Sequence, residues 1–119
     1  MPIPRTRTMQ MQDVHLSSRI PDIGTASTHW VVCPIAGFME RLSIVRGGSL
    51  SDDETVSVTV GAGATIVILM AAGGSAGGVT EREYTGRNEI AAGDTIKVEN
   101  AGASSDTEPA TVAIVIRRL

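Results

Sequence analysis

Apolar and polar residues alternate along most of the chain from residue 13 onward, and this alternation predicts β-strands. Val14, Leu16 and Ile20 share one parity, and valines alternate with serine and threonine over 55–60. A period of two residues is that of a half-buried strand, because successive side chains of a strand point to opposite faces of its sheet. No amphipathic helix of ten or more residues is visible, so the pattern predicts an all-β fold.

Turns rich in glycine, serine and aspartate divide the chain into about eight short strands. Beyond the first strand at 14–20, the expected strands lie at 28–33, 38–44, 55–60, 65–70, 80–84, 95–98 and 111–116. Short strands at this spacing are typical of an antiparallel β-sandwich or jelly roll. The last strand is apolar on both faces, which predicts a central position in its sheet. The run at 65–70 is also apolar throughout, which predicts a strand covered on both faces or one at a subunit interface.

Two local features complete the expected fold. Phe38, Leu42 and Ile44 have the same parity, so they are expected on one face of the strand at 38–44. The segment 71–78 contains only glycine, alanine and serine, and it is expected to be a flexible loop.

Length and composition are those of one folded domain. The chain has 119 residues, of which 42% are hydrophobic and 19% charged, a balance that argues against intrinsic disorder. We expect a single β-sandwich domain over 13–119. Residues 1–12 contain Pro2 and Pro4 and show no hydrophobic period. They are either a disordered terminus or an extended N-terminal arm that becomes ordered on a partner.

Charge and composition exclude several classes of partner. The net charge of −3 provides no basic field for a polyphosphate, so no nucleic acid is expected as a partner. Aromatic residues make up 3% of the chain, which is little for a glycan platform that works by stacking. The longest apolar run, 64–72, is far shorter than the roughly 20 residues of a membrane-spanning helix. Residues 1–12 lack the apolar core of a secretory signal, so we expect a soluble protein made in the cytoplasm, with no membrane partner.

The residues that most often carry catalysis do not form a recognisable set. His15 and His29 are the two histidines, and no Gly-x-Ser-x-Gly turn is present to hold a nucleophile. Cys33 is the single cysteine; it lies in an apolar stretch and is expected to be buried as a small hydrophobic residue. We therefore expect no enzyme activity and no cofactor.

Two loops that superficially suggest binding sites have simpler interpretations. The acidic cluster 52–54 offers carboxylates to a cation, but consecutive side chains of an extended segment point to opposite faces, so a solvated turn is favoured and no metal is expected. Gly61 and Gly63 lack the third glycine and following helix of a dinucleotide loop, so a turn is expected there. Trp30 lies among valines, which predicts packing in the core or at a subunit interface.

The order of these elements resembles a known family of virion proteins. The strand at 28–33 continues as Pro-Ile-Ala-Gly into the next strand, and Leu50 leads through the acidic cluster into the valine strand. A small-residue loop, an Ala-Gly-Asp turn at 92–94 and a terminal strand after Pro109 follow. This layout over 13–119 resembles the capsid decoration (cement) proteins of tailed bacteriophages, which are β-sandwich or jelly-roll proteins.

The resemblance implies a structural role without catalytic residues. Cement proteins sit on the capsid surface of the virion, commonly as homotrimers at three-fold positions, and bridge copies of the major capsid protein. Three weak contacts on one rigid trimer give strong avidity. An alternative is a head-fibre or tail-associated module that binds a host glycan or receptor, although the single Trp and single Tyr argue against it.

Two sets of residues are expected to make the contacts of a cement protein. The arm would bind the capsid, where its arginines meet acidic surface, through Ile3, Arg5, Arg7, Met9 and Met11. The apolar runs offer more hydrophobic surface than one sandwich needs, so part of them is expected between subunits, at Trp30, Ile66, Ile68, Met70, Ile114 and Ile116.

Overall fold

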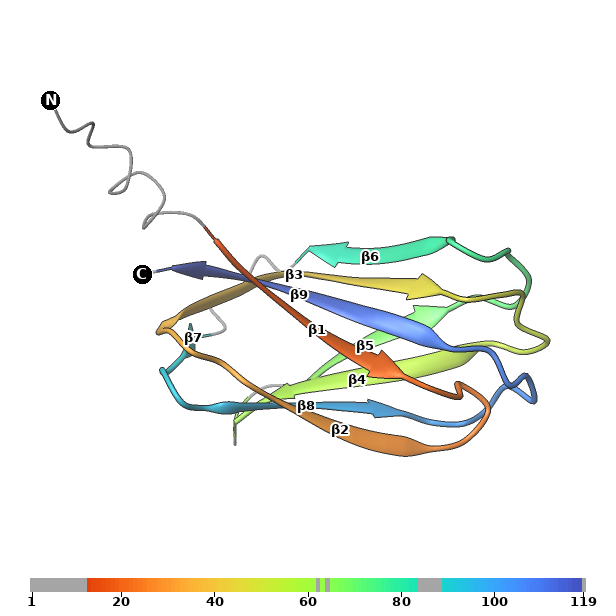
Figure 1. Ribbon diagram of the computed structural model, residues 1–119, viewed down its shortest axis with the longest axis horizontal. Helices are drawn as coiled ribbons and strands as arrows, with labels where there is room; N and C mark the ends of the chain where they lie inside the picture. Colours follow the sequence, from red (N-terminus) through yellow and green to blue (C-terminus); the bar gives the residue numbers. More distant parts are fainter. Residues whose placement is uncertain (1–12, 62, 64, 84–88, 119) are drawn as a thin grey trace, which may run out of the picture.

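The computed structural model describes residues 13–61, 63, 65–83 and 89–118, which form two antiparallel sheets packed face to face (Figure 1). The prediction of an all-β sandwich is confirmed. The five arm residues named above lie outside the described residues, as does Tyr84.

Every strand pair in both sheets is antiparallel. The first sheet has the order β1-β9-β3-β6, with the short β7 also paired to β3; its strands are β1 (Val14–Ile20), β9 (Ala110–Arg118), β3 (Gly37–Arg46), β6 (Val79–Glu83) and β7 (Glu89–Ile90). The second sheet has the order β2-β8-β4-β5, made of β2 (Ser27–Val32), β8 (Thr95–Asn100), β4 (Glu54–Val60) and β5 (Thr65–Met70). The described residues thus contain nine strands rather than about eight, and β9 is central, as predicted.

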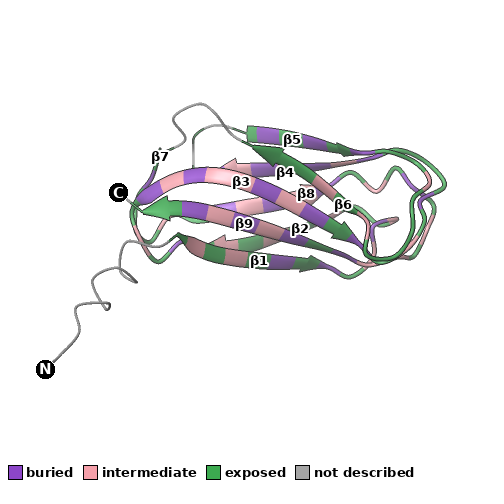
Figure 2. Cartoon of the chain, turned by 90° about the horizontal axis from the view of Figure 1, so that it is seen from above, coloured by how far each residue is buried: buried purple, intermediate pink, exposed green. Residues whose placement is uncertain are grey.

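Side chains of one parity from most strands fill the space between the sheets. Val56, Val58 and Val60 of β4 are buried, as are Val112 and Ile114 of β9 (Figure 2). The residues between them are half-buried or exposed on the outer faces. Both faces of β9 are apolar because the central strand is also partly covered on its outer side.

The expected parity of β3 is wrong at Phe38. The pairing of β3 with β9 shifts between Met39 and Arg41, where a β-bulge adds one residue to β3. Met39 before the bulge and Leu42 after it therefore both face the core, although their numbers differ by three. Phe38 is half-buried on the other parity.

The strand β5 is an edge strand that is covered on one face only. Its burial alternates strictly, so Val67 and Leu69 are 46% and 55% exposed while their neighbours face the core. Its edge meets the opposite sheet through Arg82 of β6, whose Nη1 donates a hydrogen bond of 2.7 Å to the carbonyl oxygen of Val67.

The structure corrects most of the predicted subunit interface. Five of its six side chains are at most 3% exposed inside the core of their own chain, so they cannot contact another subunit: Ile66, Ile68, Met70, Ile114 and Ile116. In an all-apolar strand the sequence does not distinguish the face toward the core from the face toward solvent, and the predicted contacts are the residues that face the core. Trp30 is 61% exposed on the outer side of β2. The prediction that it packs in the core is therefore wrong, and its side chain remains available for a contact with another molecule.

The loops gather at the two ends of the sandwich (Figure 1). Loops 21–26, 47–53, 71–78 and 101–109 meet at one end, called here the loop end. The opposite end, called the arm end, holds the start of β1 and the end of β9, where Val14 pairs with Ile116.

Candidate functional site

The loop end contains most of the buried polar side chains. Arg46, Glu54, Asn100 and Ser104 are each at most 8% exposed, and each lies at the end of a strand or in a loop there. A buried polar group is costly unless it is hydrogen-bonded. The bonds that these four make therefore define the candidate site.

Arg46 holds the glycine-rich loop 71–78 against the end of β3. Its Nη1 donates hydrogen bonds of 2.9 Å to the carbonyl oxygen of Ala71 and 2.7 Å to that of Gly73. The backbone of Leu50 pairs with Gly73 in both directions, at 3.0 and 2.7 Å. The predicted flexible loop is thus attached to its surroundings at several points.

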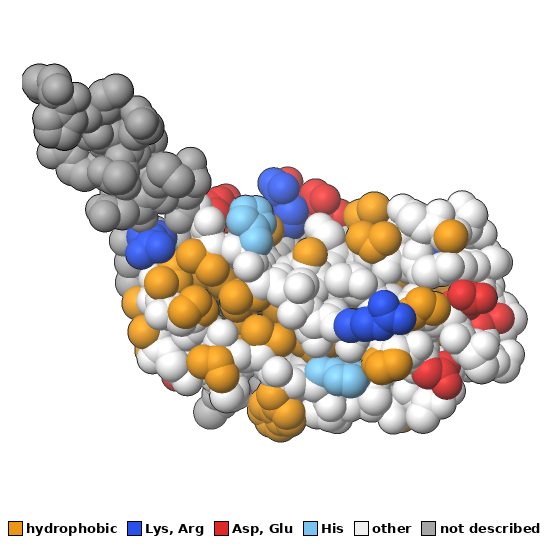
Figure 3. All heavy atoms as spheres, in the orientation of Figure 1, with side chains coloured by type: hydrophobic (Ala, Val, Ile, Leu, Met, Phe, Trp, Pro, Cys, Tyr) orange, Lys and Arg blue, Asp and Glu red, His pale blue; other side chains and the backbone are white. Residues whose placement is uncertain are grey.

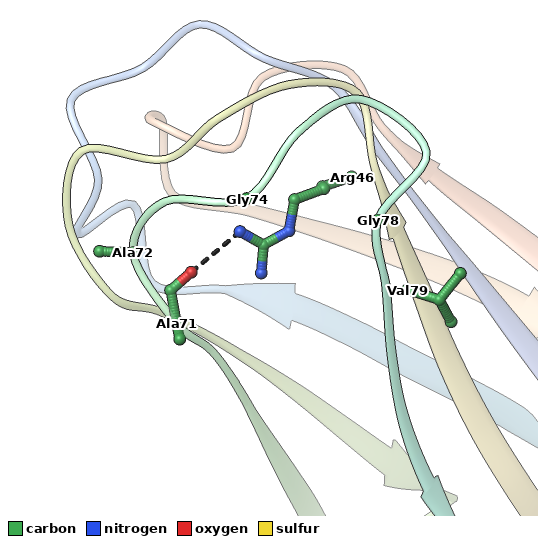
Figure 4. Close-up of a pocket in the computed structure, with 6 residues that line it drawn as sticks. All are labelled: Arg46, Ala71, Ala72, Gly74, Gly78 and Val79. Carbon is green, nitrogen blue, oxygen red and sulfur yellow. Dashed lines mark hydrogen bonds between the residues drawn. The ribbon is translucent and has the colours of Figure 1, made fainter.

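The guanidinium lies in a hollow of about 250 Å³ (Figure 4). Small side chains form most of its wall, which consists of Arg46, Ala71, Ala72, Gly74, Gly78 and Val79. Gly74 has φ +79°, and a Cβ there would lie 2.6 Å from Nη1 of Arg46. Glycine is therefore required for the loop to pass so close to the cation.

A second polar group joins β2, β8 and the loop 21–26. Ser27 Oγ lies 2.5 Å from Oδ1 of Asn100 and 3.0 Å from Nε2 of His29. The amide nitrogen of Asn100 donates to the carbonyl oxygens of Ile23 and Thr25, so its Oδ1 must accept the proton of Ser27. Nε2 of His29 must then be the donor to Ser27.

This direction of hydrogen bonds is the wrong one for a nucleophilic serine. A general base would have to accept the serine proton, but that proton is already bonded to Asn100. A hollow of about 230 Å³ beside Ser27 and His29 is lined also by Pro21, Asp22 and Thr25. We interpret the group as a structural network that fixes the loop 21–26 to β8.

Glu54 is the first residue of β4 and is fully buried, so the predicted solvated turn is wrong at this position. Its Oε1 accepts hydrogen bonds from the backbone N–H groups of Thr55 and Ala103, at 3.2 and 3.1 Å, while Oε2 has no hydrogen-bond partner among the described residues. Asp52 and Asp53 are exposed, as predicted, and Oδ1 of Asp53 accepts from the N–H of Ala72.

Asp106 accepts three hydrogen bonds, and two of them join the loop 101–109 to the loop 47–53. Its Oδ2 accepts from Oγ of Ser104 at 2.6 Å, and from the backbone N–H and the hydroxyl of Ser51. These bonds, that from Ser104 first, favour the charged carboxylate and hold the pKa of Asp106 below its ordinary value.

The remaining candidates from the sequence are scattered. His15 is exposed on β1, and Cys33 is buried with its Sγ donating to the carbonyl oxygen of Ile35, as expected for a small hydrophobic residue. Gly61 has φ +53° in the predicted turn after β4. The described part of the chain contains no group of three or more His, Cys, Asp or Glu side chains placed to hold a metal ion. It also contains no helix with the length and apolarity needed to cross a membrane.

An apolar seam lies where the two sheets meet along β1 and β2. Half-buried apolar side chains form it, namely Val14, Leu16, Val31 and Ile35. Trp30 and Val32 are 61% and 59% exposed just around the edge of β2. Hydrophobic side chains gather over this half of the molecule, toward the arm end, in the space-filling view (Figure 3).

Comparisons with known proteins find solved structures that are similar to this chain in fold. A scan against protein-family models gave no match, and a search of curated proteins gave none either. Among solved structures, the exo-beta-1,3-galactanase from Phanerochaete chrysosporium with galactose is 15% identical with a TM-score of 0.47; the match covers 90% of this chain and 27% of that one. The Podospora anserina GH26-CBM35 beta-(1,4)-mannanase is 20% identical with a TM-score of 0.48, over 79% of this chain and 19% of that one. This chain thus spans less than a third of either protein.

Proposed function

We propose that the chain is a capsid decoration protein of a tailed bacteriophage, which binds the outer shell and acts by surface contact rather than by catalysis. The apolar seam carries this proposal. Its side chains are only half covered by their own chain, and it begins at Val14, directly after the segment proposed as the arm. The seam and the arm would therefore meet one partner surface, the major capsid protein, together.

We also propose a trimer, with a different part of the molecule between the subunits. Val67 and Leu69 replace the buried residues of β5 as candidate contacts, because they are the exposed apolar positions of the same strand. They lie on the outer face of an edge strand, where a neighbouring subunit has access. A closed ring of three would repeat this contact around its axis.

Two single substitutions separate these contacts. Val32→Glu places a charge beside the seam, and Leu69→Glu places one on β5; the two side chains are 59% and 55% exposed, so both variants should fold. Light scattering should give about 37 kDa for the wild type, three times the 12.4 kDa of one chain. Val32→Glu should keep that mass and bind undecorated phage shells weakly, whereas Leu69→Glu should lower the mass.

Deletion of 1–12 tests the proposed arm in the same assay. The shortened protein should keep its fold and mass and lose affinity for shells. If the wild type is monomeric and does not sediment with shells, the proposed function is wrong. Unchanged shell binding after the deletion would reject the arm alone.

The alternative, a head-fibre or tail module for a host glycan or receptor, is favoured by one observation. Trp30 is well exposed, and Nζ of Lys97 lies 5.8 Å from the centre of its ring. An exposed indole can stack on a sugar ring. Because Trp30 is the only tryptophan of the chain, its fluorescence reports directly on such binding, and a saturable change with a glycan but not with shells would select this alternative.

A further inference from the structure

Arg46 is a buried cation without a matching carboxylate among the described residues. The residue is 8% exposed, and its two hydrogen bonds, both from Nη1, go to neutral backbone carbonyls. The ion pairs of the described residues involve Arg41 and Lys97 instead. Burial of a charge without an opposite charge is costly, and carbonyl oxygens offset only part of that cost.

The rest of the guanidinium is open to the hollow. Nε and Nη2 donate no hydrogen bond to the described residues, and neither is among the buried polar atoms left without a partner, so solvent reaches both. In the close-up, Nη1 points to the carbonyl of Ala71 while the other two nitrogens point away from it (Figure 4). The edge formed by two such N–H groups is the one that pairs with a planar anion through two parallel hydrogen bonds.

The wall of the hollow limits what this edge can meet. Ala71, Ala72 and Gly74 leave space next to the cation, and the side chains of Ala72 and Val79 point away from it in the close-up (Figure 4). A single positive charge matches a single negative charge, whereas a phosphate dianion would need further donors.

We infer that the hollow at Arg46 binds a carboxylate, with Nε and Nη2 as the donors. The carboxylate can belong to an acidic side chain of a partner protein or to a small acid such as a uronic sugar. The chemistry at Arg46 is the same for both. This inference is independent of the proposed function, because the hollow is at the loop end and the apolar seam extends toward the arm end.

Nuclear magnetic resonance of the arginine Nε–H groups tests the inference directly. Acetate is titrated into ¹⁵N-labelled protein at constant ionic strength, with chloride as the replaced anion. The Arg46 signal should move and saturate with a dissociation constant on the order of 1–10 mM, as expected for so small a ligand. The signal of Arg19, which is exposed on β1, serves as the internal control and should not saturate.

Gly78→Leu is the decisive variant, because residue 78 lines the hollow and a Cβ there would lie 3.4 Å from Cδ of Arg46, while the bonds from Nη1 of Arg46 to the backbone carbonyls remain possible. It should weaken acetate binding at least about tenfold, and the signal of Arg46 itself reports whether the loop is still in place. Arg46→Lys keeps the charge but not the planar edge, and it should also bind acetate more weakly.

Two larger probes identify the source of the carboxylate. Tighter binding of a capped tripeptide with a central glutamate would indicate a protein partner, and tighter binding of glucuronate would indicate an acidic sugar. Three results would overturn the inference: no saturable shift of Arg46, equal shifts of all arginines, or an unchanged response in Gly78→Leu. Saturation by sulfate but not by acetate would also overturn it.

Discussion

Ser51 and Asp106, 55 positions apart, are joined by two hydrogen bonds to one carboxylate oxygen. The backbone N–H and the hydroxyl of Ser51 both donate to Oδ2 of Asp106, and this connects the loops 47–53 and 101–109. Since these bonds favour the charged form of the Asp106 carboxyl, the contact depends on pH.

Asp106→Asn should lower the free energy of unfolding at pH 7, and the loss should disappear in acid. The pKa of Asp106 is lowered in the folded state, so its contribution is present above the unfolded value of about 3.9 and is lost as pH falls through the folded value. Urea unfolding at pH 7, 5 and 3 measures this. Asp52→Asn removes an exposed carboxylate next to Ser51 in the loop 47–53; it is the control and should show a much smaller difference. If the wild type is more stable than Asp106→Asn by the same free energy at all three pH values, the stability does not depend on the charge of Asp106 and the prediction is wrong.

Glu54→Gln and Glu54→Ala should differ in stability although both remove the charge. Alanine leaves the N–H groups of Thr55 and Ala103 without their acceptor, which costs about 1–3 kcal/mol. Glutamine keeps an acceptor oxygen and removes a buried charge, so it should be as stable as the wild type or more so. Denaturant unfolding at pH 7 compares them. Equal losses in both variants would mean that Oε2 has a partner that requires the negative charge.

Ser27 should not react as a nucleophile. Its proton is bonded to Asn100, so a fluorophosphonate probe should leave the native protein unlabelled. Ser27→Ala should instead lower the free energy of unfolding by about 1 kcal/mol, because Asn100 and His29 lose a partner. Peptide mapping after treatment with the probe checks the first outcome, and label on Ser27 would reverse the interpretation.

Val58→Asp and Thr59→Asp test the parity of β4 with adjacent residues. Val58 is fully buried, so a carboxylate there is unpaired in the core and should prevent folding. Thr59 is half-buried on the outer face, where it lies opposite Lys97, and its variant should remain folded. Circular dichroism and solubility distinguish the two, and a folded Val58→Asp protein would reject the parity.

The strand pattern could be predicted from the sequence because burial and period agree in most strands. The bulge in β3 could not, since it changes parity between Met39 and Arg41 without a glycine or proline to mark it. The one-sided burial of β5 was also hidden, because an edge strand with exposed valine and leucine has the same composition as a strand covered on both faces.

The buried polar residues left a signal in the sequence that composition alone does not reveal. Arg46 has the parity of Ile44, Glu54 that of Val56, and Asn100 that of Val98. Each is a polar residue at a core position at the end of a strand. That these ends meet could not be predicted, because the sequence does not give the strand order.

The bond between Arg82 and Val67 has a consequence for copies of the protein at high local concentration. The free edge of a sheet is a template to which another strand can add, and such addition leads to aggregation. Arg82 occupies a carbonyl in the middle of β5, so an incoming strand must first displace a charged donor. One side chain thereby favours contact between copies through their faces over polymerisation through their edges.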